Sequence, residues 1–114
     1  MTDCVFCKIV KGELPAKRKY EDELVLAFED TKPSSPVHIL IIPKKHINNI
    51  SAVSEEDEKI LGRCQLVAKK LARKLEIQAF RLSTLNGEDA GQVVFHLHYH
   101  LMGGWEKGKF PKLV

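Results

Sequence analysis

Three histidines alternate with large apolar residues in the segment 95–102, FHLHYHLM. Strict alternation predicts a β-strand whose apolar side chains face a core. The imidazoles of His96, His98 and His100 should then lie together on the opposite face, about 7 Å apart along the strand. The whole chain has 5 histidines, so three of them in one short strand indicate a functional site. A chance run on an exposed strand and a structural metal site are the alternatives.

The composition is typical of one folded domain, which we expect to cover residues 1–114. Hydrophobic residues make up 44% of the chain and charged residues 29%, enough for a core and an ordinary polar surface. The net charge of +3 is too small to indicate a nucleic acid partner. The sequence has no apolar run of membrane-spanning length and no signal-peptide pattern. Its 3 cysteines do not indicate a disulfide framework, so a cytoplasmic location is the default expectation.

Short strands surround one long amphipathic helix in the predicted fold. Alternating or continuous apolar runs predict strands at residues 18–21, 24–29, 38–42 and 80–85, besides the strand with the histidines. The helix should begin at Ser54, a favourable N-cap, and its apolar positions recur every three or four residues as far as Leu75. A short helical turn ending at Gly12 precedes the first strand. This order of elements predicts an α+β fold with an antiparallel sheet.

Histidines on such a strand can act on phosphorus. A neutral imidazole attacks through one nitrogen when an acceptor holds the other, and a backbone carbonyl of the same strand can serve. A second histidine two residues away can bind a phosphate oxygen or protonate a leaving group. Gly91 and Gln92 form a turn before the strand whose backbone N–H groups could point at an anion. Because the sequence has no lysine-bearing phosphate loop and no acidic magnesium cluster, nucleotidyl transfer through histidine is favoured.

The histidine motif and three further blocks resemble the histidine triad superfamily. The other blocks are CVFCKI at residues 4–9, PVHILIIPKKH at 36–46 and GQVVFH at 91–96. Together with Gly103 and Gly104 they are similar to the histidine triad nucleotide-binding (Hint) branch, over residues 4–104. The resemblance implies a five-stranded antiparallel sheet packed on one long helix, a short N-terminal helix, and a homodimer with a continuous sheet.

The resemblance also implies roles for individual residues in the hydrolysis of a purine nucleotide. His98 is expected to be the nucleophile, His100 to contact the phosphate near the leaving group, and His38 to support the same site. Asp30 should accept the ribose hydroxyls, a role that suits a carboxylate. The nucleotide-binding residues implied in this way are Val5, Phe6, Phe28, Asp30, Thr31, Gln92, Val93, Val94, His98 and His100.

Cys4 and Cys7 have the spacing of half a zinc site. The pair alone is a weak indication, because a tetrahedral structural site needs four ligands. The resemblance implies that His46 and His96 complete a structural Zn²⁺ site, one ion per chain, which leaves the other triad histidines for chemistry. Two alternatives stay open: a catalytic zinc held by two or three triad histidines, and a pair of unbound thiols.

Three positions depart from the family pattern. Leu85 stands where an asparagine is usual, Val93 where some relatives have a serine, and Trp105 where an arginine is common. Asn86 is adjacent to Leu85, but a shift by one residue would turn its side chain to the other face of the strand. These changes bear on substrate affinity and preference rather than on the type of reaction.

The sequence therefore predicts a purine nucleotide-binding hydrolase. The favoured activity is that of a nucleoside phosphoramidase, which attacks the α-phosphate of AMP conjugates through a covalent His98–AMP intermediate. A dinucleoside polyphosphate hydrolase is the alternative within the superfamily, and a nucleotide-binding or interaction protein with little turnover is the alternative of another class. The expected partners are the nucleotide and a second copy of the chain, without nucleic acid or membrane.

Overall fold

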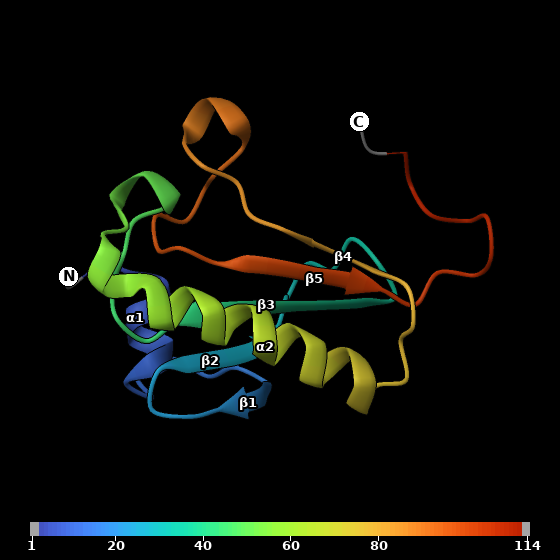
Figure 1. The fold of residues 1–114 in the computed structure, drawn as a ribbon, viewed down its shortest axis with the longest axis horizontal. Coiled ribbons are helices and arrows are strands. Elements are labelled where there is room, and N and C mark those ends of the chain that lie inside the picture. Colours follow the sequence, from blue (N-terminus) through green and yellow to red (C-terminus); the bar gives the residue numbers. More distant parts are fainter. Residues whose placement is uncertain (1–2, 113–114) are drawn as a thin grey trace.

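Five strands form one antiparallel sheet in the computed structural model, which describes residues 3–112 (Figure 1). The sheet has the order β1-β2-β3-β5-β4. This is the α+β fold that the sequence predicts, with a short N-terminal helix and one long helix. The elements in chain order are α1 (Val5–Val10), β1 (Arg18–Glu21), β2 (Val25–Glu29), β3 (Val37–Pro43), α2 (Glu58–Lys74), β4 (Phe80–Ser83) and β5 (Tyr99–Gly103).

The long helix α2 covers one face of the sheet (Figure 1). Its apolar positions pack on alternate residues of β2, β3 and β5, and Cys64 and Val67 are fully buried there. Burial raises the pKa of the Cys64 thiol to about 12, so this cysteine is a core residue rather than a reactive one. Within residues 3–112, no helix is both long and apolar enough to cross a bilayer.

The short helix α1 covers part of the opposite face. Phe6 and Ile9 of α1 pack on the residues of β2 and β3 that alternate with those facing α2, including Phe28 and Leu40. Both faces of the central strand β3 are therefore covered, which explains its nearly unbroken apolar sequence. Since α1 spans only 6 residues, it leaves the rest of this face open toward β5 and β4.

The histidine segment is hydrogen-bonded as a strand over only part of its length. We predicted one strand through all three histidines, but β5 begins at Tyr99. His96 and His98 precede the ladder, where the N–H of Leu97 donates instead to the carbonyl oxygen of Ile47 (2.6 Å). The predicted alternation nevertheless holds, because the apolar residues between the histidines are buried in the core beneath α2.

Two predicted boundaries shift by a few residues. α2 begins at Glu58 rather than at Ser54, because a turn of 3-10 helix (Glu55–Asp57) comes first. Ser54 caps this turn as predicted: its N–H donates to the Asp57 carboxylate at 3.0 Å. β4 leaves its ladder after Ser83 rather than at residue 85.

Candidate active site and metal centre

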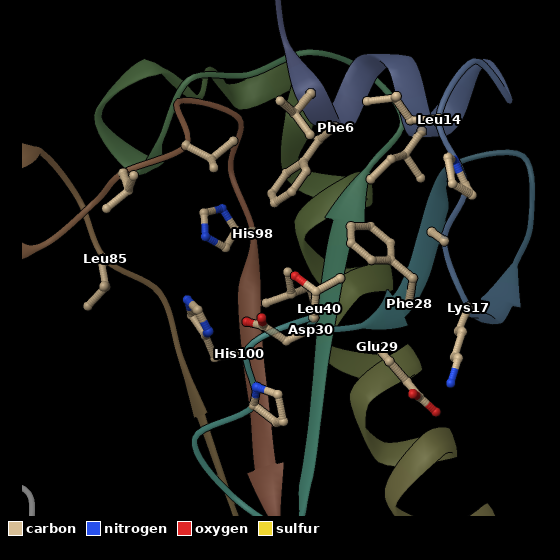
Figure 2. Close-up of a pocket in the computed structure, with 18 of the residues that line it drawn as sticks. Phe6, Leu14, Lys17, Phe28, Glu29, Asp30, Leu40, Leu85, His98 and His100 are labelled. Carbon is tan, nitrogen blue, oxygen red and sulfur yellow. The ribbon is translucent and has the colours of Figure 1, made fainter.

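A cavity of about 1030 Å³ opens on the side of the sheet that carries α1. Figure 2 shows the aromatic rings of Phe6 and Phe28 on one side of it and the imidazoles of His98 and His100 in the middle. Most of its lining is apolar, and the charged groups are few. Ligand pockets typically measure about 300–1,000 Å³, so this cavity suits a ligand of nucleotide size rather than a small metabolite.

The side chain of His98 is held in one orientation by its own segment. Its Nδ1 lies 2.7 Å from the carbonyl oxygen of His96, which can only accept, so Nδ1 bears the proton. The lone pair of the neutral ring is then on Nε2. The ring of Phe6 packs against this imidazole at 5.1 Å with an interplanar angle of 89°. The backbone carbonyl expected from the sequence thus holds the nitrogen that does not react.

His38 and His100 form a chain of hydrogen bonds with a defined direction. The N–H of Ser34 donates to Nδ1 of His38 at 2.9 Å, so the proton of neutral His38 is on Nε2. That Nε2 lies 2.9 Å from Nδ1 of His100, which must therefore accept. The proton of His100 is then on Nε2, a buried atom that has no partner within residues 3–112. His38 lies behind His100 rather than in the lining of the cavity.

Asp30 lies at the end of β2, beside this chain. One carboxylate oxygen accepts from the N–H of Lys32 at 2.8 Å, and the other is 3.5 Å from Nε2 of His38. The first contact fixes the side chain in a turn, and the carboxylate still lines the cavity. A carboxylate has lone pairs for further donors, so Asp30 can accept hydroxyl groups of a ligand.

Burial keeps the histidines of the site neutral. Desolvation lowers the pKa of His98, against the opposing effects of the His96 carbonyl and of Asp30. Desolvation, together with the neighbouring imidazoles of His98 and His38, lowers the pKa of His100 to about 4. Desolvation also lowers the pKa of His38, against the attraction of Asp30. All three rings are therefore neutral near pH 7.

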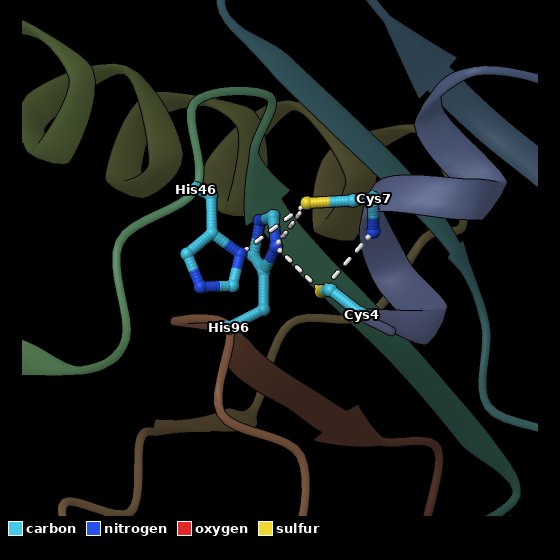
Figure 3. A group of neighbouring side chains, drawn as sticks. All are labelled: Cys4, Cys7, His46 and His96. Atoms are coloured by element: carbon cyan, nitrogen blue, oxygen red, sulfur yellow. Dashed lines mark hydrogen bonds between the residues drawn. The ribbon is translucent and has the colours of Figure 1, made fainter. Parts of the chain in front are cut away.

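A second cluster joins α1 to the start of the histidine segment. Figure 3 shows Cys4 and Cys7 facing His46, from the loop after β3, and His96. Each residue offers one ligand atom, and the four atoms lie within 4.8 Å of one another. Cys7 Sγ is 3.3 Å from Nδ1 of His46 and 3.6 Å from Nδ1 of His96, and Cys4 Sγ is 3.4 Å from Nδ1 of His96. This group can hold a metal ion.

The surroundings of both imidazoles suit metal ligands. Nε2 of His96 donates to the carbonyl oxygen of Pro43 (2.7 Å), and Nε2 of His46 donates to Oδ1 of Asn48 (2.8 Å). These acceptors place the lone pair of each neutral ring on Nδ1, the atom that faces the sulfurs. In a tetrahedral zinc site, S and N ligands are about 3.6 Å apart, close to the observed separations.

Asp30, His38 and His100 form a third group with metal-ligand atoms within 4.8 Å. The hydrogen bond from Ser34 argues against a metal there, since it places the proton of neutral His38 on the nitrogen that would bind. The two histidine clusters therefore differ in kind: one presents lone pairs to a common centre, and the other is a directed chain of hydrogen bonds.

The comparisons with known proteins agree on one family. The model of the HIT domain family matches residues 11–107. The chain belongs to the HIT family. It is 50% identical over 103 residues to a HIT-like protein of Synechocystis, covering 90% of both chains, and 38% identical over 104 residues to the protein HitA of Neisseria gonorrhoeae, covering 90% of this chain and 97% of that one. A HIT family hydrolase of Clostridium thermocellum has 48% identity and a TM-score of 0.93, with 100% of this chain and 99% of that chain covered.

Most of the nucleotide-binding residues expected from the HIT resemblance meet in one cavity. Val5, Phe6, Thr31, Val93 and Val94 line it, as do Phe28, Asp30, His98 and His100. Gln92 does not line it. The Gln92 side chain is buried, accepts from the N–H of Gly87 (2.8 Å) and donates to the carbonyl oxygens of Asn48 (2.8 Å) and Val94 (3.1 Å), so it holds the loop before the triad in shape.

Several residues that line the cavity were not predicted as site residues from the sequence. The loop residues 14–17 cover its outer side, and no periodicity could have placed them. Leu40 could have been found, because it alternates with the β3 residues that face α2. Leu85 lines the cavity, whereas Asn86 bonds to Ser51 through both its oxygen (2.9 Å) and its nitrogen (3.0 Å). Asn86 therefore does not take the place of the asparagine usual at position 85.

The nitrogen that carries the proton in His38, His98 and His100 can be determined directly. We expect His98 to carry its proton on Nδ1 and both His38 and His100 to carry theirs on Nε2. Because the pKa of His100 is about 4, its ring should stay neutral on acidification to pH 5.5, well below the 6.5 of a free histidine. Nitrogen-15 shifts of the labelled rings measure both properties. Titration of His100 near pH 6.5, or a proton on its Nδ1, would contradict the assignment.

Proposed function

We propose that this HIT protein is a purine nucleotide hydrolase of the Hint branch, and that its activity is that of a nucleoside phosphoramidase. The observation that supports this most is the pair of opposite tautomers at the cavity. His98 offers a lone pair on Nε2, and His100 offers a proton on Nε2, two residues away on the same face. Transfer of a nucleotidyl group from an amine requires a nucleophile and a hydrogen-bond donor to the leaving nitrogen.

The proposed reaction has two steps. Nε2 of His98 bonds to the α-phosphorus of an AMP conjugate while the bond between phosphorus and the amine nitrogen breaks. The Nε2–H of neutral His100 donates a hydrogen bond to this nitrogen, which takes its proton from solvent and leaves as the amine. Water then attacks the phosphorus, the bond to His98 breaks, and AMP leaves. The attacking water releases one proton to solvent, while the chain from Ser34 through His38 holds His100 in place.

The apolar end of the cavity would hold the base and Asp30 the ribose. Phe6 and Phe28 meet edge to face at 5.4 Å and offer an aromatic surface to a purine. Asp30 lies between this surface and the histidines in Figure 2, where a ribose would connect the base with the phosphate.

We also propose that the Cys4, Cys7, His46 and His96 cluster holds one structural Zn²⁺. Two thiolates and two imidazoles form a closed tetrahedral set, without an open position for water, so the ion would supply structure rather than chemistry. It would join α1 to the triad segment. His96 would be a ligand through Nδ1 while its carbonyl oxygen orients His98.

The function is tested by incubating the purified protein with an AMP amidate and with diadenosine tetraphosphate. We expect steady release of amine and AMP from the amidate. Hydrolysis of the tetraphosphate alone would favour the alternative within the family. Stoichiometric binding of AMP without turnover of either compound would contradict the proposed enzyme and favour a nucleotide-binding protein.

Thr84 should position the nucleophile. Beyond the last β4–β5 pair, its hydroxyl donates to the carbonyl oxygen of His98 at 2.7 Å and replaces a ladder hydrogen bond. Thr84→Val removes this donor at nearly constant volume, at a cost of about 1 kcal/mol. We expect kcat to fall about 5-fold with KM nearly unchanged, because the nucleophile is then less well oriented for attack. Thr84→Ser keeps the hydroxyl and should retain kcat; equal losses of kcat in both variants would refute the positioning role.

We propose a homodimer in which two β4 edges pair. β4 is a terminal strand of the sheet, and Phe80 on it is 42% exposed. Leu66 of α2 is 57% exposed as well. Pairing would cover both the strand edge and this apolar surface, and two-fold dimers are the commonest assemblies. Light scattering at micromolar concentration should give twice the 12.9 kDa of the chain; a mass of one chain would contradict the dimer.

A further inference from the structure

The cavity continues past the histidines, on the side away from the aromatic rings. Strand order places Phe28 of β2, Leu40 of β3, His100 of β5 and then the chain after β4 in sequence across the sheet. Figure 2 accordingly shows Leu85 on the opposite side of His98 and His100 from Phe28. If the base occupies the aromatic side, the group that leaves the phosphorus must lie on the side of Leu85.

This second side is apolar and open. Leu85 is 38% exposed and Val93 is 85% exposed, although both line the cavity. Gly91 also lines the cavity, and a Cβ on it would be 3.5 Å from Cδ1 of Leu85. The three residues therefore form one neutral surface beside the imidazoles, which we call the Leu85 surface. Exposed large apolar side chains lining a cavity indicate contact with an apolar ligand group.

No lysine or arginine among the described lining residues lies on the Leu85 side of the cavity. Among the cavity-lining residues in the described range 3–112, the one lysine or arginine is Lys17, which lies beside Glu29 on the aromatic side (Figure 2). Arg81 of β4 is directed elsewhere: it donates to the carbonyl oxygen of Pro111 and stacks on Trp105 at 5.2 Å and on Phe110 at 5.7 Å. A leaving group with several negative charges would meet apolar side chains here, without a lysine or arginine among the described lining residues to balance its charge.

We infer that the Leu85 surface selects uncharged, apolar leaving groups, so that the preferred substrates are AMP conjugates of aliphatic or aromatic amines rather than of anionic groups. This inference rests on the proposed function and adds the class of leaving group. The departing amine would keep its apolar substituent on Leu85 and Val93 while its nitrogen accepts the hydrogen bond from His100. The same residues disfavour dinucleoside polyphosphates.

The test uses two leaving groups of nearly equal size. The full-length protein is assayed with the AMP amidates of pentylamine and of 4-aminobutanoate, which differ in a terminal ethyl or carboxylate group, and with diadenosine tetraphosphate. Differences of one small group in an apolar pocket change kcat/KM about 10–200-fold. We expect kcat/KM to be at least about 10-fold higher for the pentylamine conjugate than for the carboxylate conjugate.

Charged variants provide the second part of the test. Leu85→Lys and Val93→Lys should each lower the preference for the pentylamine conjugate at least about 5-fold and raise relative activity on diadenosine tetraphosphate. The matched control is Leu75→Lys, because Leu75 is equally exposed, at 39%, but lies at the end of α2 outside the cavity. It should keep the wild-type preference. Val93 is so exposed that its replacement leaves the core intact even if Leu85→Lys does not fold.

The outcomes separate this inference from the function on which it rests. Equal kcat/KM for both amidates, or a preference that Val93→Lys leaves unchanged, would overturn the inference and leave the phosphoramidase proposal standing. An equally large loss of the pentylamine preference in Leu75→Lys would also overturn the inference. The net charge of the protein, rather than the Leu85 surface, would then determine the preference. Absence of turnover with every AMP conjugate would overturn both.

Discussion

Replacing His98 by asparagine should lower turnover of an AMP amidate by about 10³-fold or more, because loss of a covalent nucleophile removes the whole two-step route. The amide can accept or donate a hydrogen bond but cannot form the bond to phosphorus. Affinity for AMP should stay within a few-fold of wild type, since Phe28 and Asp30 are unchanged. Rapid quench with a labelled amidate, followed by mapping of the acid-labile adduct, measures the step itself.

His100→Asn supplies the comparison for this result. It replaces the proposed hydrogen-bond donor to the leaving group but keeps the nucleophile, so the adduct should still form on His98, at a reduced rate. An adduct on His96 or His100, or near wild-type turnover in His98→Asn, would show that the nucleophile has been misassigned. Retained AMP binding in both variants separates loss of chemistry from loss of fold.

Removing the proposed Zn²⁺ should cost more stability than any single substitution outside the core. We expect protein purified without added zinc to contain one Zn²⁺ per chain and Cys4→Ser to lose it. An ion present at 1,000 times its dissociation constant stabilises a fold by about 4 kcal/mol, so chelation or Cys4→Ser should lower the free energy of unfolding by about that amount. Activity should fall less than in His98→Asn, because the cluster acts on His98 only through the backbone of His96.

Cys64→Ala is the matched control for the metal. Cys64 is fully buried beneath α2, so its replacement should lower stability while the zinc content stays at one per chain. Metal analysis and denaturant unfolding, performed on the same samples, distinguish the two effects. A metal-free wild-type protein in which Cys4 and Cys7 both react freely with a thiol reagent would refute the zinc site.

Local pattern was sufficient to predict the sheet and the long helix. The period of two in the histidine segment, the continuous apolar run of β3 and the three-to-four spacing of α2 each follow from the geometry of one element facing a core. The ends of the elements were predicted less accurately, as at β5. The hydrogen bonds of a strand depend on its partner strand, and the periodicity of one segment gives no information about that partner. The start of α2 was also predicted too early, because a 3-10 turn follows Ser54. The capping hydrogen bonds of Ser54 mark the start of a helical turn but do not determine whether it is 3-10 or α.

The motif also singled out the three histidines, but not what distinguishes them. His98 is oriented by a carbonyl of its own segment, but the other two histidines differ from it through remote partners: Ser34 and His38 for His100, and the carbonyl oxygen of Pro43 for His96. These contacts select which nitrogen holds the proton, and they join segments up to 62 residues apart. Spacing along one strand carries no information about them.

The family resemblance was enough to propose which side chains belong to the site: Cys4, His46 and the triad lie in its motif blocks, and Asp30 is implied by it. The shape of the cavity had to come from the fold. Leu85 lies in it and Asn86 does not, because β4 leaves its ladder after Ser83 and the loop held by Gln92 turns successive side chains to different surroundings. Side-chain direction at the end of a strand depends on such long-range contacts, and a sequence pattern specifies it only while the strand stays paired.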